Sequence, residues 1–172
     1  MIHLQRATEY ADGVLSGRVP ACKWVKIAIK RQQRDLKRKK WKWRFDTDRA
    51  SAICEFIEAL PHVKGRYTAT IELAPWQCWI LTTVFGWVDA RGFRRLRTAY
   101  LELPRKQGKS TLTSGVGLYL LGADGEPGAE VYSAATTRDQ AKIVWSDAKA
   151  MVDRTQDLRD ALGINASAHS IY

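Results

Sequence analysis

The chain has 172 residues, of which 45% are hydrophobic, and it carries a formal net charge of +10. This length and apolar fraction fit a folded domain with a core and exclude wholesale disorder. The longest uncharged run, residues 73–88, is too short and too polar to span a membrane, so we expect no membrane partner. The three cysteines show neither metal-ligand spacing nor a disulfide framework, and we expect small core residues of a cytosolic protein.

The positive charge is concentrated in one segment. Residues 23–44 contain eleven Lys or Arg and a single acid, Asp35, while the other 17 basic residues are balanced by 17 acidic ones. Such a segment suits a polyanion, and Trp24, Trp41 and Trp43 could add stacking on bases. The alternative is a solvated helix face that only aids solubility.

Two helices are predicted before residue 62. The first, over residues 20–39, is amphipathic and basic, with apolar side chains recurring every three or four positions. The second begins after Asp46, Thr47 and Asp48, which are typical of a helix N-terminus, and ends at Pro61. Its expected buried stripe is Ala50, Ile53, Cys54, Ile57 and Leu60.

Further along the chain, helical and extended patterns alternate. Residues 67–73 are predicted to be extended, and Pro75 is well placed as the first residue of a helix. Residues 96–103 and 129–135 have the composition of buried strands, each followed by an amphipathic or apolar helix. The helix after residues 129–135 begins with a capping box that runs from Thr137 to Gln140.

This order predicts an α/β fold. It corresponds to the βαβα start of a parallel P-loop NTPase sheet, preceded by an α-helical N-terminal region. Three regions are expected: a basic helical region at 1–62, a linker and helix at 63–92, and the first part of a P-loop ATPase domain at 93–172.

The stretch between the first strand and its helix contains Gly108, Lys109 and Ser110. In the phosphate-binding loop G-x-x-x-x-G-K-[ST], backbone N–H groups cradle phosphates, the Lys reaches the β and γ oxygens, and the hydroxyl ligates Mg²⁺. Leu103 occupies the place of the first Gly. The tripeptide alone occurs often by chance, but a strand before it and a helix after it favour a true phosphate loop.

Several segments resemble the large subunit of tailed-phage terminases, the ATP-driven motors that package double-stranded DNA into procapsids. The matching segments are YADGVLSG (10–17) with ACKWV (21–25), LAPWQ (73–77) with FGW (85–87), PRKQGKS (104–110), and SAATTRDQA (133–141). In that family a basic stretch replaces the leading Gly of the loop, so Leu103 fits the pattern.

The resemblance implies ATP and Mg²⁺ as ligands. Lys109 would neutralise phosphate charge, Ser110 would coordinate Mg²⁺, and Arg105 would stabilise transition-state charge, unless it only orders the loop. Gln77 would read adenine, unless it is a helix residue satisfied by the backbone. The residues expected to bind the nucleotide are Gln77, Arg105, Lys106, Gln107, Gly108, Lys109, Ser110 and Thr111.

An ATPase of this class also needs an apolar strand that ends in Asp with a neighbouring Glu, and the family carries a two-metal nuclease with an acidic cluster. The sequence contains neither. We therefore expect an N-terminal portion of such a protein, which binds nucleotide weakly and hydrolyses it slowly. The resemblance implies double-stranded DNA, the terminase small subunit and the portal protein as partners, a homo-oligomeric ring, and the host cytoplasm as location.

Two other functions remain open from the sequence. A different P-loop nucleic-acid motor, such as a helicase, would also contain the loop at Lys109. A non-enzymatic module would use only the basic segment 23–44 to bind DNA or a protein.

Overall fold

The computed structural model describes residues 1–64, 70–167, 170 and 171. The chain forms two compact units, each of which is described by itself. Unit 1 comprises Met1–Glu55 and Leu73–Leu101, and unit 2 comprises Phe56–Glu72 and Glu102–Tyr172. Within the described ranges, no helix is long and apolar enough to cross a membrane.

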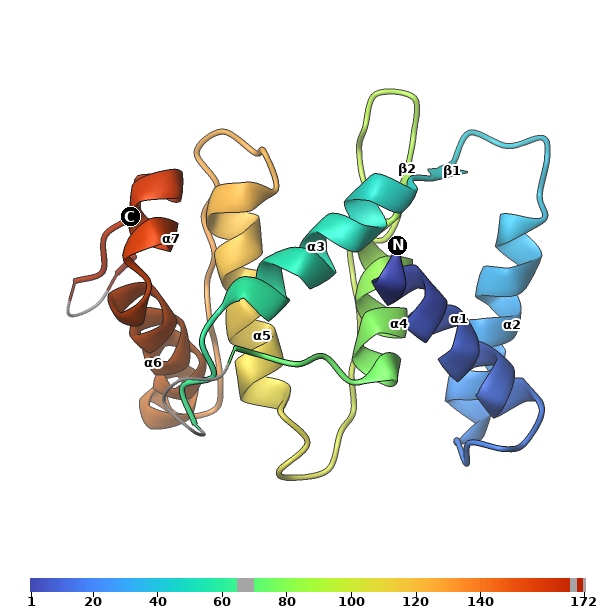
Figure 1. Cartoon of the computed structure of the whole chain (residues 1–172), viewed down its shortest axis with the longest axis horizontal. Helices are drawn as coiled ribbons and strands as arrows, with labels where there is room; N and C mark the ends of the chain where they lie inside the picture. The colour runs from blue at the N-terminus through green and yellow to red at the C-terminus, as the bar shows by residue number, and fades with distance from the viewer. Residues whose placement is uncertain (65–69, 168–169, 172) are drawn as a thin grey trace. The chain divides into compact units, whose positions relative to one another are not determined.

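Unit 1 is mostly helical (Figure 1). Its elements are α1 (Ile2–Leu15), α2 (Lys23–Leu36), β1 (Arg44–Phe45), the first part of α3 (Thr47–Ala59), α4 (Pro75–Phe85) and β2 (Trp87–Val88). The two short strands pair antiparallel, with Arg44 opposite Val88 and Phe45 opposite Trp87. They form the only sheet among the described residues.

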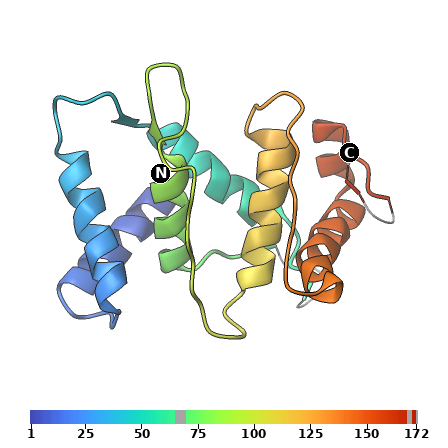
Figure 2. The same cartoon turned by 180° about the vertical axis from the view of Figure 1, so that it is seen from behind.

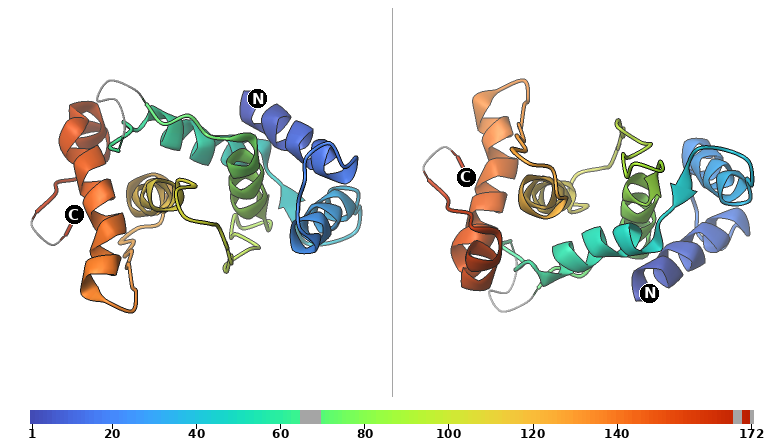
Figure 3. Two further views of the ribbon diagram at one scale, coloured as in Figure 1. Left: turned by 90° about the horizontal axis from the view of Figure 1, so that it is seen from below. Right: turned by 90° about the horizontal axis from the view of Figure 1, so that it is seen from above.

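Helix α1 packs against α4 and α2 in this unit (Figure 3). It buries Ala7, Ala11 and Val14, whose spacing of four and three residues places them on one side of the helix. The same periodicity is present in the sequence, yet no helix was predicted over residues 2–15, so α1 is an addition to the sequence-based prediction.

Helix α2 packs on the rest of unit 1 through Ile29 and through a cluster of polar and aromatic side chains. The Trp87 indole N–H donates to Gln32 Oε1 at 2.6 Å. The carboxylate of Asp35, 2% exposed, lies 2.8 Å from Arg95 Nη2. Burial would raise the pKa of Asp35, but the hydrogen bond and charge of Arg95 outweigh it and hold that pKa below its ordinary value.

The helix predicted between Asp46 and Pro61 is confirmed as α3. It spans Thr47–Ala59, and all five residues of the expected stripe are buried. The carboxylate of Asp46 accepts a hydrogen bond from the N–H of Arg49 at 3.1 Å, which is the capping contact that the sequence indicates. The helix predicted over residues 20–39 is three residues too long at each end, because α2 spans Lys23–Leu36.

Unit 2 contains the end of α3, α5 (Lys109–Leu118), a π-helical turn η1 (Tyr119–Ala123), α6 (Arg138–Arg154) and α7 (Gln156–Leu162). Helices α5 and α6 pack side by side (Figure 2). Helix α6 buries Ala148, Met151 and Val152 from its predicted apolar face, and Thr137 Oγ1 accepts from the N–H of Gln140 as the capping box predicts.

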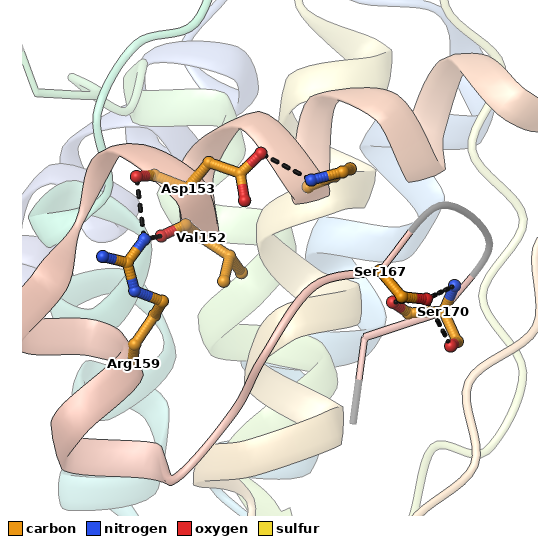
Figure 4. Close-up of polar contacts among 6 residues, drawn as sticks. Val152, Asp153, Arg159, Ser167 and Ser170 are labelled. Atoms are coloured by element: carbon orange, nitrogen blue, oxygen red, sulfur yellow. Dashed lines mark hydrogen bonds and ion pairs between the residues drawn. The ribbon is translucent and has the colours of Figure 1, made fainter.

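A basic side chain closes the corner between α6 and α7. Arg159 Nη1 donates to the carbonyls of Val152 and Asp153 at 3.2 and 2.9 Å (Figure 4). These carbonyls belong to the last turn of α6, and that of Val152 also accepts a hydrogen bond from the N–H of Thr155 at 3.2 Å. The contact therefore ends α6 and fixes the direction of α7.

The parallel sheet predicted from the sequence is not observed in the described residues. Neither 96–103 nor 129–135 forms a strand, and residues 131–135 are exposed rather than buried. A strand is held by hydrogen bonds to a neighbouring strand, and no described strand lies beside either segment. Of the extended segment predicted at 67–73, residues 67–69 lie outside the described part, and Thr70 forms an isolated bridge with Pro61.

Candidate nucleotide-binding site

Residues 105–108 form a turn that leads directly into α5 in unit 2. Lys106 and Gly108 both have positive φ angles, 65° and 70°, while Gln107 between them does not. Alternation of left-handed and right-handed residues turns successive backbone N–H groups toward one side, which makes an anion-binding concavity. The two positive φ angles of this loop, at Lys106 and Gly108, are the part of such a concavity that the structure shows.

The N-terminus of α5 follows the same loop. Gly108 is the N-cap and makes no side-chain cap, and the first intrahelical hydrogen bond joins the N–H of Leu112 to the carbonyl of Gly108 at 2.9 Å. The N–H groups of the first turn therefore have no acceptor within α5. That turn contains no acidic residue, so nothing there competes with a bound anion for the helix dipole.

The side chains of the loop are cationic and accessible. Arg105, Lys106 and Lys109 are exposed, and none of them forms an ion pair with a described residue. Ser110 is half-buried and Thr111 is buried at the base of the loop. The structure thus brings together seven of the predicted site residues, 105–111, on one loop and the first turn of one helix.

Helix α5 is firmly anchored behind this loop. Ser114, fully buried, has its Oγ 2.8 Å from the carbonyl of Ser110 and 2.7 Å from the carbonyl of Val144 on α6. The position of a Cβ on Gly115 lies 3.0 Å from the side chain of Ile57, so a larger residue would push α5 away from the end of α3. These contacts fix the first turn of α5 and hence the direction of its free N–H groups.

Gln77, the eighth predicted site residue, lies in unit 1 at the start of α4. Its Oε1 accepts a hydrogen bond from the N–H of Ala74 at 2.8 Å, which caps the helix. Its amide N–H₂ has no described partner. The alternative considered from the sequence, a helix residue satisfied by the backbone, is therefore present in the structure, and the amide N–H₂ is still available to a base.

The donor set of the loop fits a nucleotide with Mg²⁺. Backbone N–H groups and cations suit the phosphates, and the Ser110 hydroxyl is an oxygen ligand of the kind that Mg²⁺ takes beside phosphate oxygens. Among the described residues, no group of three or more His, Cys, Asp or Glu side chains could hold a metal ion by itself. A metal at this loop would therefore share its coordination with the nucleotide and water.

The sequence identifies the residues of the loop but not its backbone conformation. The positive φ of Lys106 could not be predicted, because a lysine rarely adopts that conformation and no glycine marks the position. The requirement for Gly at residue 108, by contrast, follows from the motif itself.

One comparison with known proteins covers the segment that contains this loop. The family model of the terminase large subunit ATPase domain matches residues 75–162, just over half of the 172 residues. This range contains α4 with Gln77, the loop and α5, and α6. No curated protein and no solved structure matches the chain. The chain therefore belongs to the terminase large subunit family, and residues 75–162 belong to its ATPase domain.

Proposed function

We propose that this chain is the ATP-binding N-terminal portion of a motor that packages double-stranded DNA into phage procapsids. The observation that carries the proposal is the loop 105–108, with its two positive φ angles and accessible cations, at the open N-terminus of α5. It lies within the range matched by the ATPase-domain family.

Each residue of the loop has a role in this proposal. The backbone from Arg105 to Thr111 binds the phosphate oxygens, with Lys106, Gln107 and Gly108 shaping the turn. Lys109 balances the charge of the β and γ phosphates. When bound, Mg²⁺ withdraws charge from the phosphates, and Ser110 supplies a hydroxyl ligand to it.

Arg105 is proposed as the residue that stabilises charge on the transferred phosphoryl group. Its guanidinium is permanently charged and planar, so it can bind two phosphate oxygens at once. It is exposed and has no described ion-pair partner, which supports this role over a purely structural one. Gln77 is proposed to donate its amide N–H₂ to adenine while its oxygen caps α4.

The segments 96–103 and 129–135 are proposed to be strands of a parallel P-loop sheet in the full motor. Their β-rich composition and their positions before α5 and α6 support this assignment. The motor would also comprise an endonuclease, assemble as a homo-oligomeric ring in the host cytoplasm, and contact the terminase small subunit and the portal protein. These partners are proposed by analogy with the family to which the chain belongs.

Nucleotide binding tests the proposal directly. Fluorescence anisotropy of a methylanthraniloyl-ATP probe with Mg²⁺ is expected to rise saturably with the 172-residue chain. Lys109→Ala is expected to weaken binding at least about tenfold, because one of the charges facing the phosphates is lost. The matched control is Lys142→Ala, an exposed lysine of α6 outside the loop, which should bind as the wild type does. Equal affinity of wild type and Lys109→Ala would contradict the proposed site.

A further inference from the structure

A second candidate surface lies in unit 1, outside the range matched by the family model. We call it the basic surface, and it comprises the Lys and Arg residues of α2 and the segment that follows. All eleven are exposed: Lys23, Lys26, Lys30, Arg31, Arg34, Lys37, Arg38, Lys39, Lys40, Lys42 and Arg44. The structure thus turns a charge run of the sequence into one accessible face.

The charge of this surface is not compensated locally. The one acid of the segment, Asp35, is buried and shared between Arg95 and Arg34, so it compensates at most one cation of the face. Only Arg34 and Arg44 form ion pairs, with Asp35 and Asp46. The other nine cations have no ion pair with a described residue. A protein keeps so many like charges together at an electrostatic cost, which a polyanion would relieve.

The cations on α2 follow the helix axis. Lys23, Lys26, Lys30 and Lys37 are spaced by three, four and seven residues, which places them along one side of the helix. The buried positions Ile29, Gln32 and Asp35 form the opposite part of its circumference. With a rise of about 1.5 Å per residue, the row extends over roughly 20 Å, enough to follow several successive phosphates of one strand.

The aromatic residues of the segment do not form a platform for bases. Trp41 packs edge-on against Trp87 at a centroid distance of 5.4 Å, and the guanidinium of Arg95 lies 4.4 Å from its ring centroid. Trp43 is half-buried. Trp24 alone among the three is exposed, at 67%. The ring of Trp41 thus already contacts Trp87 and Arg95, and the stacking role considered for the three tryptophans stays a prediction.

We propose that the basic surface binds the phosphate backbone of double-stranded DNA without reading its sequence. The identity of the polyanion as duplex DNA rests on the proposed function, whereas the surface itself does not involve the nucleotide loop. DNA held here would contact unit 1 through a helix that the ATPase-domain match does not include.

The test measures binding of a fluorescein-labelled 30-base-pair duplex to the 172-residue chain over a series of salt concentrations. The variant Lys26→Gln/Lys30→Gln/Lys37→Gln removes three charges from the row. Binding should weaken at least about tenfold at 0.1 M salt, and the slope of log affinity against log salt should fall by about 2.7, at about 0.9 per phosphate contact. Two duplexes of unrelated sequence should bind equally well.

The control variant Arg18→Gln/Arg97→Gln/Lys142→Gln removes the same charge from exposed positions elsewhere. It should lose less than about twofold in affinity, and both variants should keep the thermal unfolding midpoint of the wild type. Equal losses in the two variants would overturn the proposal, because binding would then follow net charge alone. Tighter binding of single-stranded DNA, abolished by Trp24→Ala, would overturn it in favour of base stacking. Polyglutamate that competes as well as duplex DNA would overturn it in favour of an acidic protein.

The nucleotide loop provides an independent readout. Lys109→Ala should bind the duplex as the wild type does. If Lys26→Gln/Lys30→Gln/Lys37→Gln binds DNA as the wild type does while Lys109→Ala loses ATP binding, only the basic surface is refuted. If Lys109→Ala binds ATP as the wild type does while the triple variant loses DNA binding, only the proposed nucleotide site is refuted.

Discussion

Arg95 and Asp35, sixty residues apart in the sequence, form an ion pair of 2.8 Å that joins the segment after β2 to the end of α2. The carboxylate is 2% exposed and the arginine side chain 20%. The arginine also lies against the rings of Trp41 and Trp87. Because this pair holds the buried side of α2, it also orients the basic surface on the other side.

The first prediction concerns this ion pair. Asp35→Asn should lower the free energy of unfolding by about 2 to 3 kcal/mol at pH 7, because Arg95 keeps its charge and loses its partner. The pKa of Asp35 is lowered in the folded protein, so its contribution is complete above the unfolded pKa of about 4 and is lost as the pH falls through the folded value. Urea unfolding followed by tryptophan fluorescence between pH 3 and pH 7 measures the difference between variant and wild type.

That difference should shrink below about pH 4, because there the carboxyl of the unfolded chain takes up a proton while the folded carboxylate still keeps its charge. A difference that stays constant down to pH 3 would show that the charge of Asp35 is not what stabilises unit 1. Glu9→Gln, on the exposed side of α1, is the matched control and should change stability by less than about 0.5 kcal/mol at either pH.

The second prediction compares two glycines inside α5. At Gly117 a Cβ would meet its nearest neighbour, Val131, at 3.7 Å, which is ordinary contact. Gly117→Ala should therefore stabilise the protein by about 0.5 to 1 kcal/mol through helix propensity. At Gly115 a Cβ would lie 3.0 Å from the buried side chain of Ile57, so Gly115→Ala should gain nothing or destabilise. The thermal unfolding midpoint should rise for Gly117→Ala and should not rise for Gly115→Ala, and equal stabilisation by both would contradict the packing of α5 on α3.

Much of the helical structure could be predicted from the sequence. Helix α3 has strong signals at both ends, with Asp46 as cap and Pro61 after its end, and its stripe of apolar residues repeats regularly. The capping box before α6 is equally local. Such elements depend on neighbouring residues in the chain, so their prediction needs no knowledge of tertiary packing.

The features that are not observed, or that the sequence could not predict, depend on distant partners. A strand composition at 96–103 or 129–135 becomes a strand only when another strand pairs with it, and the described residues provide none. The burial of Asp35 depends on Arg95, and the packing of Trp41 depends on Trp87, in each case across many residues of sequence. The two boundaries predicted between regions, after residues 62 and 92, stay a prediction. Of the candidate site, the loop 105–111 was evident from its motif, whereas the capping bond of Gln77 was only one of two open alternatives.

The third prediction separates the two roles of Gln77. Gln77→Glu keeps an oxygen that can accept from the N–H of Ala74 but removes the amide donor, whereas Gln77→Ala removes both. Gln77→Ala should destabilise unit 1 by about 1 kcal/mol, and Gln77→Glu should be nearly neutral, since an acid in the first turn also suits the helix dipole.

Both variants should lose preference for ATP over GTP if the amide reads adenine. Competition of unlabelled ATP and GTP against the labelled ATP probe measures that preference. If Gln77→Glu retains the full preference of the wild type, the residue is only a helix cap. If Gln77→Ala unfolds at the wild-type midpoint, the hydrogen bond to Ala74 does not contribute to stability.

The fourth prediction tests whether the backbone of the loop, rather than its charge alone, binds the phosphates. Gly108 has a φ of 70°, which an alanine adopts only at a cost of about 1 to 2 kcal/mol. Gly108→Ala should therefore shift the loop away from the conformation that points its N–H groups to one side, and weaken ATP binding at least about fivefold with every cation still present. Gly125 supplies the matched control, because its φ is 81° and nothing lies within 4 Å of its Cβ position. Gly125→Ala should incur a similar loss of stability and leave ATP affinity unchanged, since it lies outside the loop. Equal nucleotide affinity in the two variants would show that Lys109 and its neighbouring cations bind the phosphates without help from the backbone.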